Sequence, residues 1–302
     1  MELTWVLKIR LAAAAILGVI IIGFLAWPLA APPDPFGLVS LTAGQFTIPT
    51  ILILACLSFI CGVLGFFASW PYGKEIGIFA VPAGLAVWAI RTGPLASFIQ
   101  SNPGLEQRLQ FYGRLKWESF FWLALVLLGF AAVHICQKVF KPPKKPLPHL
   151  TQQETKLHIA LRVAIALAVS IVIGKACISI FVQDVPFLDP YLGTFVGRPV
   201  IGQVVFGIFV AFLIVGFIVR KFIGLGYIWP IIATAFITFY AVYASLSEDV
   251  LERLVERLPA NVFSDAALAV LPIQIVAFGT IGAVTGYWAA LRYQYWREHE
   301  LE

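Results

Sequence analysis

Charged side chains are scarce in this sequence. Only 12% of its 302 residues are Asp, Glu, Lys or Arg, whereas 60% are hydrophobic. A soluble domain uses about a quarter charged residues to cover its surface, so the scarcity excludes an ordinary soluble globular protein. The formal net charge of +5 is small and unevenly placed. We therefore expect no binding to nucleic acid, which needs a concentrated basic surface.

Catalytic and cofactor signatures are missing as well. The chain has no His-Glu-x-x-His, no Gly-x-Ser-x-Gly, no Walker loop, no dinucleotide-binding glycine motif and no Cys-x-x-Cys pair. Its four cysteines all lie in apolar stretches, where a thiol acts as a small buried hydrophobe. The sequence thus predicts no catalytic residue, no cofactor, no metal site and no disulfide framework.

Long apolar runs are abundant. Each run is close to the ~20 residues that a helix needs to cross ~30 Å of hydrocarbon. Helices are favoured because backbone groups in lipid must form all their hydrogen bonds within the protein. The pattern predicts an all-α integral membrane protein with about eight transmembrane helices. The runs cover residues 6–27, 50–70, 76–93, 118–138, 157–182, 200–220, 226–246 and 266–291, of which 76–93 is the shortest.

The distribution of charge predicts the topology. If the eight spans alternate, the side that carries both termini receives 13 basic and six acidic residues, and the other side receives eight basic and ten acidic ones. Basic residues concentrate on the cytoplasmic side of membrane proteins. Both termini are therefore expected in the cytoplasm, with a bacterial inner membrane as the expected location. We expect the first run to be an uncleaved anchor, because it is longer than the apolar core of a secretory signal.

The connections on the outer side are long, and two of them carry helix signals. In 94–117, Asn102 and Pro103 form a start signal. In 247–265, Ser247 is a candidate N-cap. We expect two interfacial helices that lie flat at the membrane surface or against the bundle. Their apolar faces are candidate partner-docking sites: Leu105, Leu109 and Tyr112 in the first, and Leu251, Leu254 and Leu258 in the second.

The alternation of short inner and long outer loops occurs twice, which suggests an internal duplication. At a spacing near 150 residues, Pro49 matches Pro199 and Gly129 matches Gly279. The predicted organisation is a four-helix repeat in 1–140, a basic Pro-rich cytoplasmic linker in 141–156 and a second four-helix repeat in 157–302. Because each copy has an even number of spans, the two repeats should be parallel.

Polar residues within the spans are few. Lys175, in the fifth run, and Gln274, near the outer end of the eighth, form the candidate polar intramembrane site. A snorkelling or structurally paired Lys175 is the preferred interpretation, and contact with a substrate anion is the alternative. Arg91, Glu118 and Arg198 are interpreted as boundary residues. Stripes of small residues in the second and eighth spans should let helices of the same bundle approach closely.

Two functional hypotheses remain open. The first is a non-catalytic membrane subunit, a scaffold or anchor in a larger membrane complex, which contacts membrane lipids and either other membrane subunits or further copies of itself. The second is a transporter of a neutral or lipid-like substrate with its path between the two repeats. The scarcity of intramembrane charge and the substantial outer loops favour the first, and an enzyme is the least favoured class.

Overall fold

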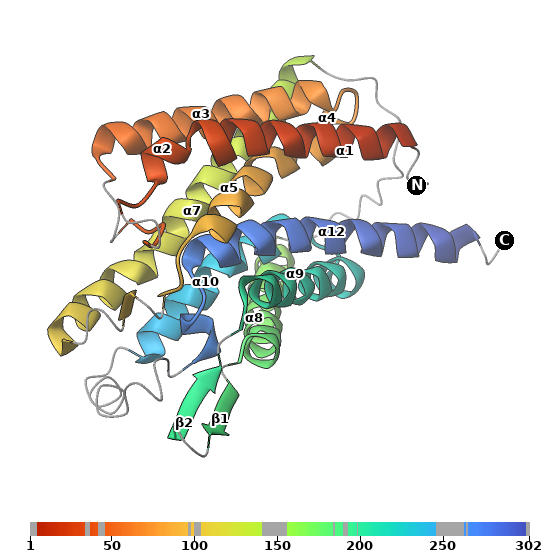
Figure 1. The fold of residues 1–302 in the computed structure, drawn as a ribbon. Helices are drawn as coiled ribbons and strands as arrows, with labels where there is room; N and C mark the ends of the chain where they lie inside the picture. The colour runs from red at the N-terminus through yellow and green to blue at the C-terminus, as the bar shows by residue number, and fades with distance from the viewer. Residues whose placement is uncertain are drawn as a thin grey trace.

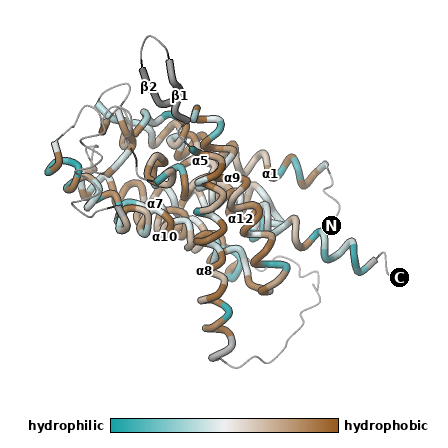
Figure 2. Tube along the Cα trace, turned by 90° about the horizontal axis from the view of Figure 1, so that it is seen from below, coloured by the Kyte–Doolittle hydropathy of each residue, from teal (hydrophilic) through white to brown (hydrophobic). Residues whose placement is uncertain are grey.

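The computed structural model is a bundle of long helices (Figure 1). The residues that it describes are 5–33, 37–41, 46–95, 98–99, 104–140, 156–183, 185–189, 193–197, 199–245, 263 and 265–299. The ends of α1 and α12 that carry the two termini lie close together, away from a small β-hairpin, as Figures 1 and 2 both show.

The first half of the chain contributes four spans. The first consists of α1 (Trp5–Gly18), the π-helical η1 (Val19–Leu25) and the short α2 (Trp27–Ala30). The second is α3 (Ile48–Ala68). The third is built from α4 (Gly73–Ile76), η2 (Gly77–Phe79) and α5 (Ala80–Arg91), and the fourth is α7 (Leu105–Phe140).

The second half contributes α8 (Lys156–Phe181), α9 (Ile201–Ile218) with the π-helical η3 (Val219–Ile223), α10 (Ile228–Ser245), the 3-10 turn η4 (Ala266–Leu268) and α12 (Pro272–His299). Between α8 and α9, β1 (Val185–Asp189) pairs antiparallel with β2 (Gly193–Gly197), and Phe187 lies opposite Phe195. The architecture is helical as expected, and the sequence did not predict the short hairpin in this connection.

Seven of the helices are long and apolar enough to cross a membrane: Trp5–Leu25, Ile48–Ala68, Gly73–Arg91, Leu105–Phe140, Ile159–Phe181, Ile201–Ile223 and Pro272–Glu298. The chain is therefore a multi-pass helical membrane protein. The remaining predicted span corresponds to Ile228–Ala244, an apolar helix that is shorter than the other seven. The run expected to be the shortest, 76–93, lies in the longer segment Gly73–Arg91 because a short helix and a 3-10 turn precede α5.

The interfacial helix expected in 94–117 does not form a separate element. Its residues from Leu105 onward belong to α7, which runs for 36 residues without a break into the fourth span. At 1.5 Å per residue this helix is about 54 Å long, well beyond the thickness of the hydrocarbon. The expected start at Asn102 and Pro103 and the second interfacial helix in 247–265, apart from its last residues, lie outside the described residues.

The helices of the two halves touch one another in the same order. In the first half, α1 contacts α3 and α5, and α7 contacts the same two helices. In the second half, α8 contacts α9 and α10, and α12 contacts these two. The halves meet where α5 packs on α12, α7 packs on α10 and α7 packs on α12. The buried core is continuous across this seam.

Glycines set the distance between the second and fourth spans of each half. A Cβ at Gly62 of α3 would collide with the carbonyl oxygen of Gly129 on α7, and a Cβ at Gly286 of α12 would collide with that of Leu213 on α9. Close backbone approach through small residues is how helices associate in lipid, where no hydrophobic force drives them together. The stripes of small residues thus pack inside the protein's own bundle.

Candidate functional site

Lys175 forms an ion pair at the end of α8. Its Nζ lies 2.7 Å from Oδ2 of Asp265, with the lysine side chain 42% exposed and the aspartate 19% exposed. The other carboxylate oxygen of Asp265 accepts a hydrogen bond from the backbone N–H of Ala267 and so caps η4. The pair joins the end of one helix to the connection that precedes α12, a structural arrangement typical of polar groups near the ends of spans.

Gln274 makes its hydrogen bonds elsewhere. Its Oε1 accepts from the backbone N–H of Leu271, one of the donors left unpaired at the start of α12. Its Nε2 donates 3.1 Å to the carbonyl oxygen of Ala89 on α5. The structure therefore uses Gln274 to join the two halves, and the two residues of the candidate intramembrane site make different contacts.

Glu118 is the most deeply buried acidic side chain among the described residues, with 1% of its surface exposed. Ser40 donates to Oε2 at 2.5 Å, the indole N–H of Trp122 donates to Oε1 at 2.9 Å, and the backbone of Leu41 adds a third hydrogen bond. All three donors are uncharged. A carboxyl group in such a place is costly to bury unless it is hydrogen-bonded, and ionisable groups inside a membrane protein mark functional sites more often than elsewhere.

The segment 37–41 carries Ser40 to Glu118. It is not helical, yet Leu38, Val39 and Ser40 are all buried. Hydrogen bonds to the end of α5 hold it in place: Val39 N–H donates to Oγ1 of Thr92, and the backbone N–H of Gly93 donates to the carbonyl oxygen of Gly37. Irregular backbone is tolerated at such depth only where protein surrounds it.

Trp122, which donates to Glu118, belongs to a cluster of aromatic rings. Trp122 and Trp88 are fully buried and meet edge to face with 6.1 Å between ring centroids, and Trp27 packs on Trp88 at 6.4 Å. Phe46 packs on Trp122 from the other side at 6.1 Å. The edge-to-face contacts stabilise the packing and exclude water from Glu118.

Sequence reasoning placed Glu118 at a membrane boundary and missed its burial. A signal was present on α7: Leu115, Trp122 and Leu125 lie three residues before and four and seven residues after Glu118. This spacing puts all four side chains on one apolar helix face, and all are buried. The pattern indicates an inward-facing acid, but it does not identify the donors.

The seam between the halves is closed by rings and hydrogen bonds. Ser119 of α7 donates to the carbonyl oxygen of Ala235 on α10 at 3.1 Å. Phe120 of α7 meets Phe236 of α10 edge to face, with centroids 5.4 Å apart. On the other side of the seam, η2 brings a ring to α12: Phe79 lies 4.9 Å from Trp288. These contacts join α7 to α10 and η2 to α12 across the seam.

The predicted docking residues of the first outer segment face the protein itself. Tyr112 is buried, and Leu105 and Leu109 are half-buried and pack against the core. This arrangement corresponds to the expectation of a helix lying against the bundle. The docking residues of the second outer segment, Leu251, Leu254 and Leu258, lie outside the described residues.

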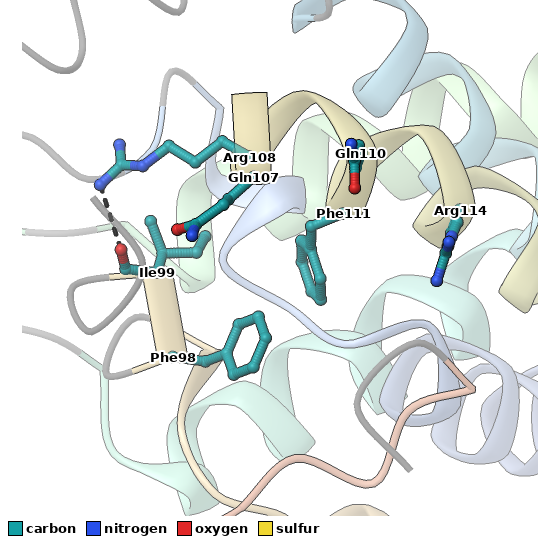
Figure 3. Close-up of a pocket in the computed structure, with 7 residues that line it drawn as sticks. All are labelled: Phe98, Ile99, Gln107, Arg108, Gln110, Phe111 and Arg114. Atoms are coloured by element: carbon teal, nitrogen blue, oxygen red, sulfur yellow. Dashed lines mark hydrogen bonds between the residues drawn. The ribbon is translucent and has the colours of Figure 1, made fainter. Parts of the chain in front are cut away.

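A pocket of about 170 Å³ opens beside the first turns of α7 (Figure 3). Arg108 lies on one side, where its Nη2 donates to the carbonyl oxygen of Ile99 at 3.1 Å. Arg114 lies on the other side, further along the helix. The pocket is lined by Phe98, Ile99, Gln107, Arg108, Gln110, Phe111 and Arg114.

Comparison with known protein families, with curated protein sequences and with solved structures gave no match. Among the described residues, no group of three or more His, Cys, Asp or Glu side chains is arranged to hold a metal ion. The contacts within this chain are therefore the basis for assigning a function.

Proposed function

We propose that this protein is a non-catalytic polytopic membrane subunit that acts as a scaffold or anchor in a larger membrane complex. The observation that carries the proposal is the closed seam. Side-chain hydrogen bonds from Gln274 and Ser119 each cross it to a backbone carbonyl oxygen of the opposite half, and two pairs of aromatic rings cross it as well. A rigid join of this kind suits a static support.

The use of the polar side chains supports the same proposal. Lys175 is paired with Asp265, and Glu118 accepts hydrogen bonds from Ser40 and Trp122. Substrate paths through membranes are lined by polar and ionisable groups that face a cavity. Here these groups hold the fold together, which favours support over transport.

An internal duplication accounts for the arrangement of the spans. The proposal pairs the helices of the two halves in chain order: α1 with α8, α3 with α9, α5 with α10 and α7 with α12. Each helix and its counterpart then have corresponding neighbours within their halves, and the contact of α5 with α12 corresponds to that of α10 with α7. Such an exchange is expected of two parallel repeats related by an axis along the membrane normal. The repeats would span 1–140 and 157–302, joined by the basic linker 141–156.

The proposed setting is a bacterial inner membrane, with both termini in the cytoplasm. The proximity of the terminal ends of α1 and α12 supports placing the two termini on one side (Figure 2). Exposed Arg292 and Arg297 lie in the last turns of α12, and basic residues favour the cytoplasmic side. A reporter enzyme that works only in the cytoplasm should be active when fused after Glu302. A reporter that works only outside the cytoplasm should be inactive at the same position, and the reverse result would contradict this topology.

The proposed partners are other membrane subunits, which would dock on Leu251, Leu254 and Leu258. The segment that carries these residues follows α10, whose exposed Tyr240 and Tyr243 provide an adjoining aromatic surface. Aromatic residues of this kind are enriched where proteins meet. Further copies of the same chain are the other partner that the proposal allows.

Native mass spectrometry of the protein, extracted in mild detergent from its own membranes, tests the proposal. A stoichiometric second polypeptide is expected. The triple change of Leu251, Leu254 and Leu258 to Asn should release it, whereas the same three changes to Met, which keep the apolar face, should retain it. A wild-type protein that carries no other polypeptide and no further copy of itself would contradict the scaffold proposal.

A transporter of a neutral or lipid-like substrate is the second candidate, and one observation favours it. The hydroxyl groups of Thr238 on α10 and Thr280 on α12 are buried and have no hydrogen-bond partner among the described residues. Unpaired buried hydroxyls are costly, and a polar substrate group that passed between α10 and α12 could bond to them. Retention of a defined small molecule by the extracted protein, and its loss in a Lys175→Ala, Gln274→Ala double variant, would favour transport.

A further inference from the structure

The pocket beside the start of α7 lies just beyond the apolar part of that helix. The apolar run begins at residue 118, and Arg114 precedes it by four residues, or about 6 Å of helix. The polar headgroup layer adds about 5–8 Å on each side of the hydrocarbon. Trp117 lies between the two positions with 61% of its surface exposed, as expected of an anchor at the membrane interface. The side of the pocket that Arg114 lines is thus at the depth of lipid headgroups.

The polar lining of the pocket suits an anion. Arg108 is only 2% exposed, and the hydrogen bond from its Nη2 to Ile99 fixes the position of its guanidinium group. Arg114, Gln107 and Gln110 are exposed and add further N–H donors around the opening. A guanidinium group presents several N–H donors in a planar fork that matches the oxygens of a phosphate group.

The apolar lining suits the part of a lipid next to its phosphate. Phe98 and Phe111 lie with ring centroids 4.9 Å apart and face the opening between the two arginines (Figure 3). The volume of about 170 Å³ is below the roughly 300 Å³ of a pocket that encloses a drug-sized ligand. A headgroup would therefore enter, and the acyl chains would remain outside in the bilayer.

From this combination of depth, donors and aromatic surface, we infer that the pocket binds the phosphate-bearing headgroup of an anionic phospholipid. Arg114 and the two glutamine amides contact the phosphate at the opening, and Arg108 supplies positive charge from the wall. The inference does not depend on the scaffold proposal, because a lipid site can serve a support or a transporter.

Lipid titration followed by native mass spectrometry tests the inference. The delipidated full chain is mixed with phosphatidylglycerol or with phosphatidylcholine of the same acyl chains, which separates the effect of headgroup charge from that of the tails. Both lipids carry a phosphate, but the positive charge of choline is repelled by Arg114, so wild-type protein should retain phosphatidylglycerol about ten-fold more tightly. Arg114→Gln and the Arg108→Gln, Arg114→Gln double variant should lose that preference.

The matched control is the Arg292→Gln, Arg297→Gln double variant, which removes charge from the far end of α12 and should keep the preference. Because Arg108 is buried, its variant can fail to fold, so the exposed Arg114→Gln variant alone decides the test. If the control and the pocket variants lost the preference for phosphatidylglycerol to the same extent, the inference would be overturned, because the preference would then be a general effect of charge. Retention of glycerol phosphate as tight as that of phosphatidylglycerol would also overturn the lipid assignment, in favour of a soluble phosphate ester.

Discussion

The two halves of the molecule arrange their helices in the same order but use their polar side chains in opposite ways. In the first half, Glu118 is fully buried and accepts hydrogen bonds from uncharged donors. In the second half, Lys175 and Asp265 form an ion pair near the surface, with the lysine 42% exposed. The difference shows that ionisable residues of this protein occupy surroundings of very different polarity.

The energetic consequences of the two arrangements differ. Removing one partner of a buried hydrogen-bonded group leaves donors that neither protein nor water satisfies, which costs the full desolvation penalty. An exposed ion pair stays in contact with water and contributes little, because water screens the charges and the side chains lose freedom. The same kind of substitution should therefore have a large effect at Glu118 and a small one at Lys175.

The largest effect is expected for Glu118→Ala. The substitution leaves the donors of Ser40, Trp122 and Leu41 without an acceptor in a buried site, at a cost of about 4 kcal/mol in the free energy of unfolding. Glu118→Gln keeps one carbonyl oxygen as an acceptor and should cost about half as much. Denaturant unfolding in detergent measures both. Equal stability of the wild type and the alanine variant would show that the buried site does not hold the first half together.

Glycine contacts are expected to matter equally in the two halves. Gly62→Ala and Gly286→Ala each place a Cβ against a backbone carbonyl oxygen that cannot move freely, so each should cost about 2 kcal/mol. Gly202→Ala, on α9 with open space around it, is the matched control and should be neutral or slightly stabilising, because Ala favours helices. Thermal unfolding of the three variants in detergent checks this. A neutral Gly62→Ala beside a damaging Gly286→Ala would break the parallel between the halves.

The two hydrogen bonds across the seam should have modest effects. Gln274→Leu removes one of them together with the bond to Leu271, and should cost about 1 to 2 kcal/mol. Ser119→Ala removes the other, at a cost of about 0.6 kcal/mol, typical of hydrogen bonds between helices in membranes. Denaturant unfolding of each variant provides the values. We expect the contact of α12 with α5, made by Gln274, to be the stronger one. A larger cost for Ser119→Ala than for Gln274→Leu would show instead that the contact of α7 with α10 is stronger.

The smallest effect is expected for Lys175→Met. The variant loses a partly exposed ion pair but keeps the apolar stem of the side chain, so its stability should fall by only about 0.3 kcal/mol. High salt should reduce the difference from wild type, since salt screens exposed charges. Unfolding measured at low and high salt tests both points. A cost as large as that of Glu118→Ala would remove the contrast between the two halves.

The spans were largely predictable from the sequence, whereas the contacts of the site were not. The apolar runs corresponded to helices because the length and hydropathy of a membrane span are properties of one local stretch. The sequence did not predict that α7 continues for 36 residues or that residues 185–189 pair with residues 193–197. It also did not predict the role of Gln274, because its acceptor, Ala89, lies 185 residues away in the chain.

By itself, the sequence determined that this is a multi-pass helical membrane protein, because the scarcity of charge and the apolar runs leave the chain few alternatives in water. Only the tertiary structure decided which partners its polar side chains contact. Ser40 reaches Glu118 from 78 residues away, and Asp265 reaches Lys175 from a distant connection. Such pairings depend on which helices pack together, and that choice is made by the shapes of many side chains at once rather than by any local pattern.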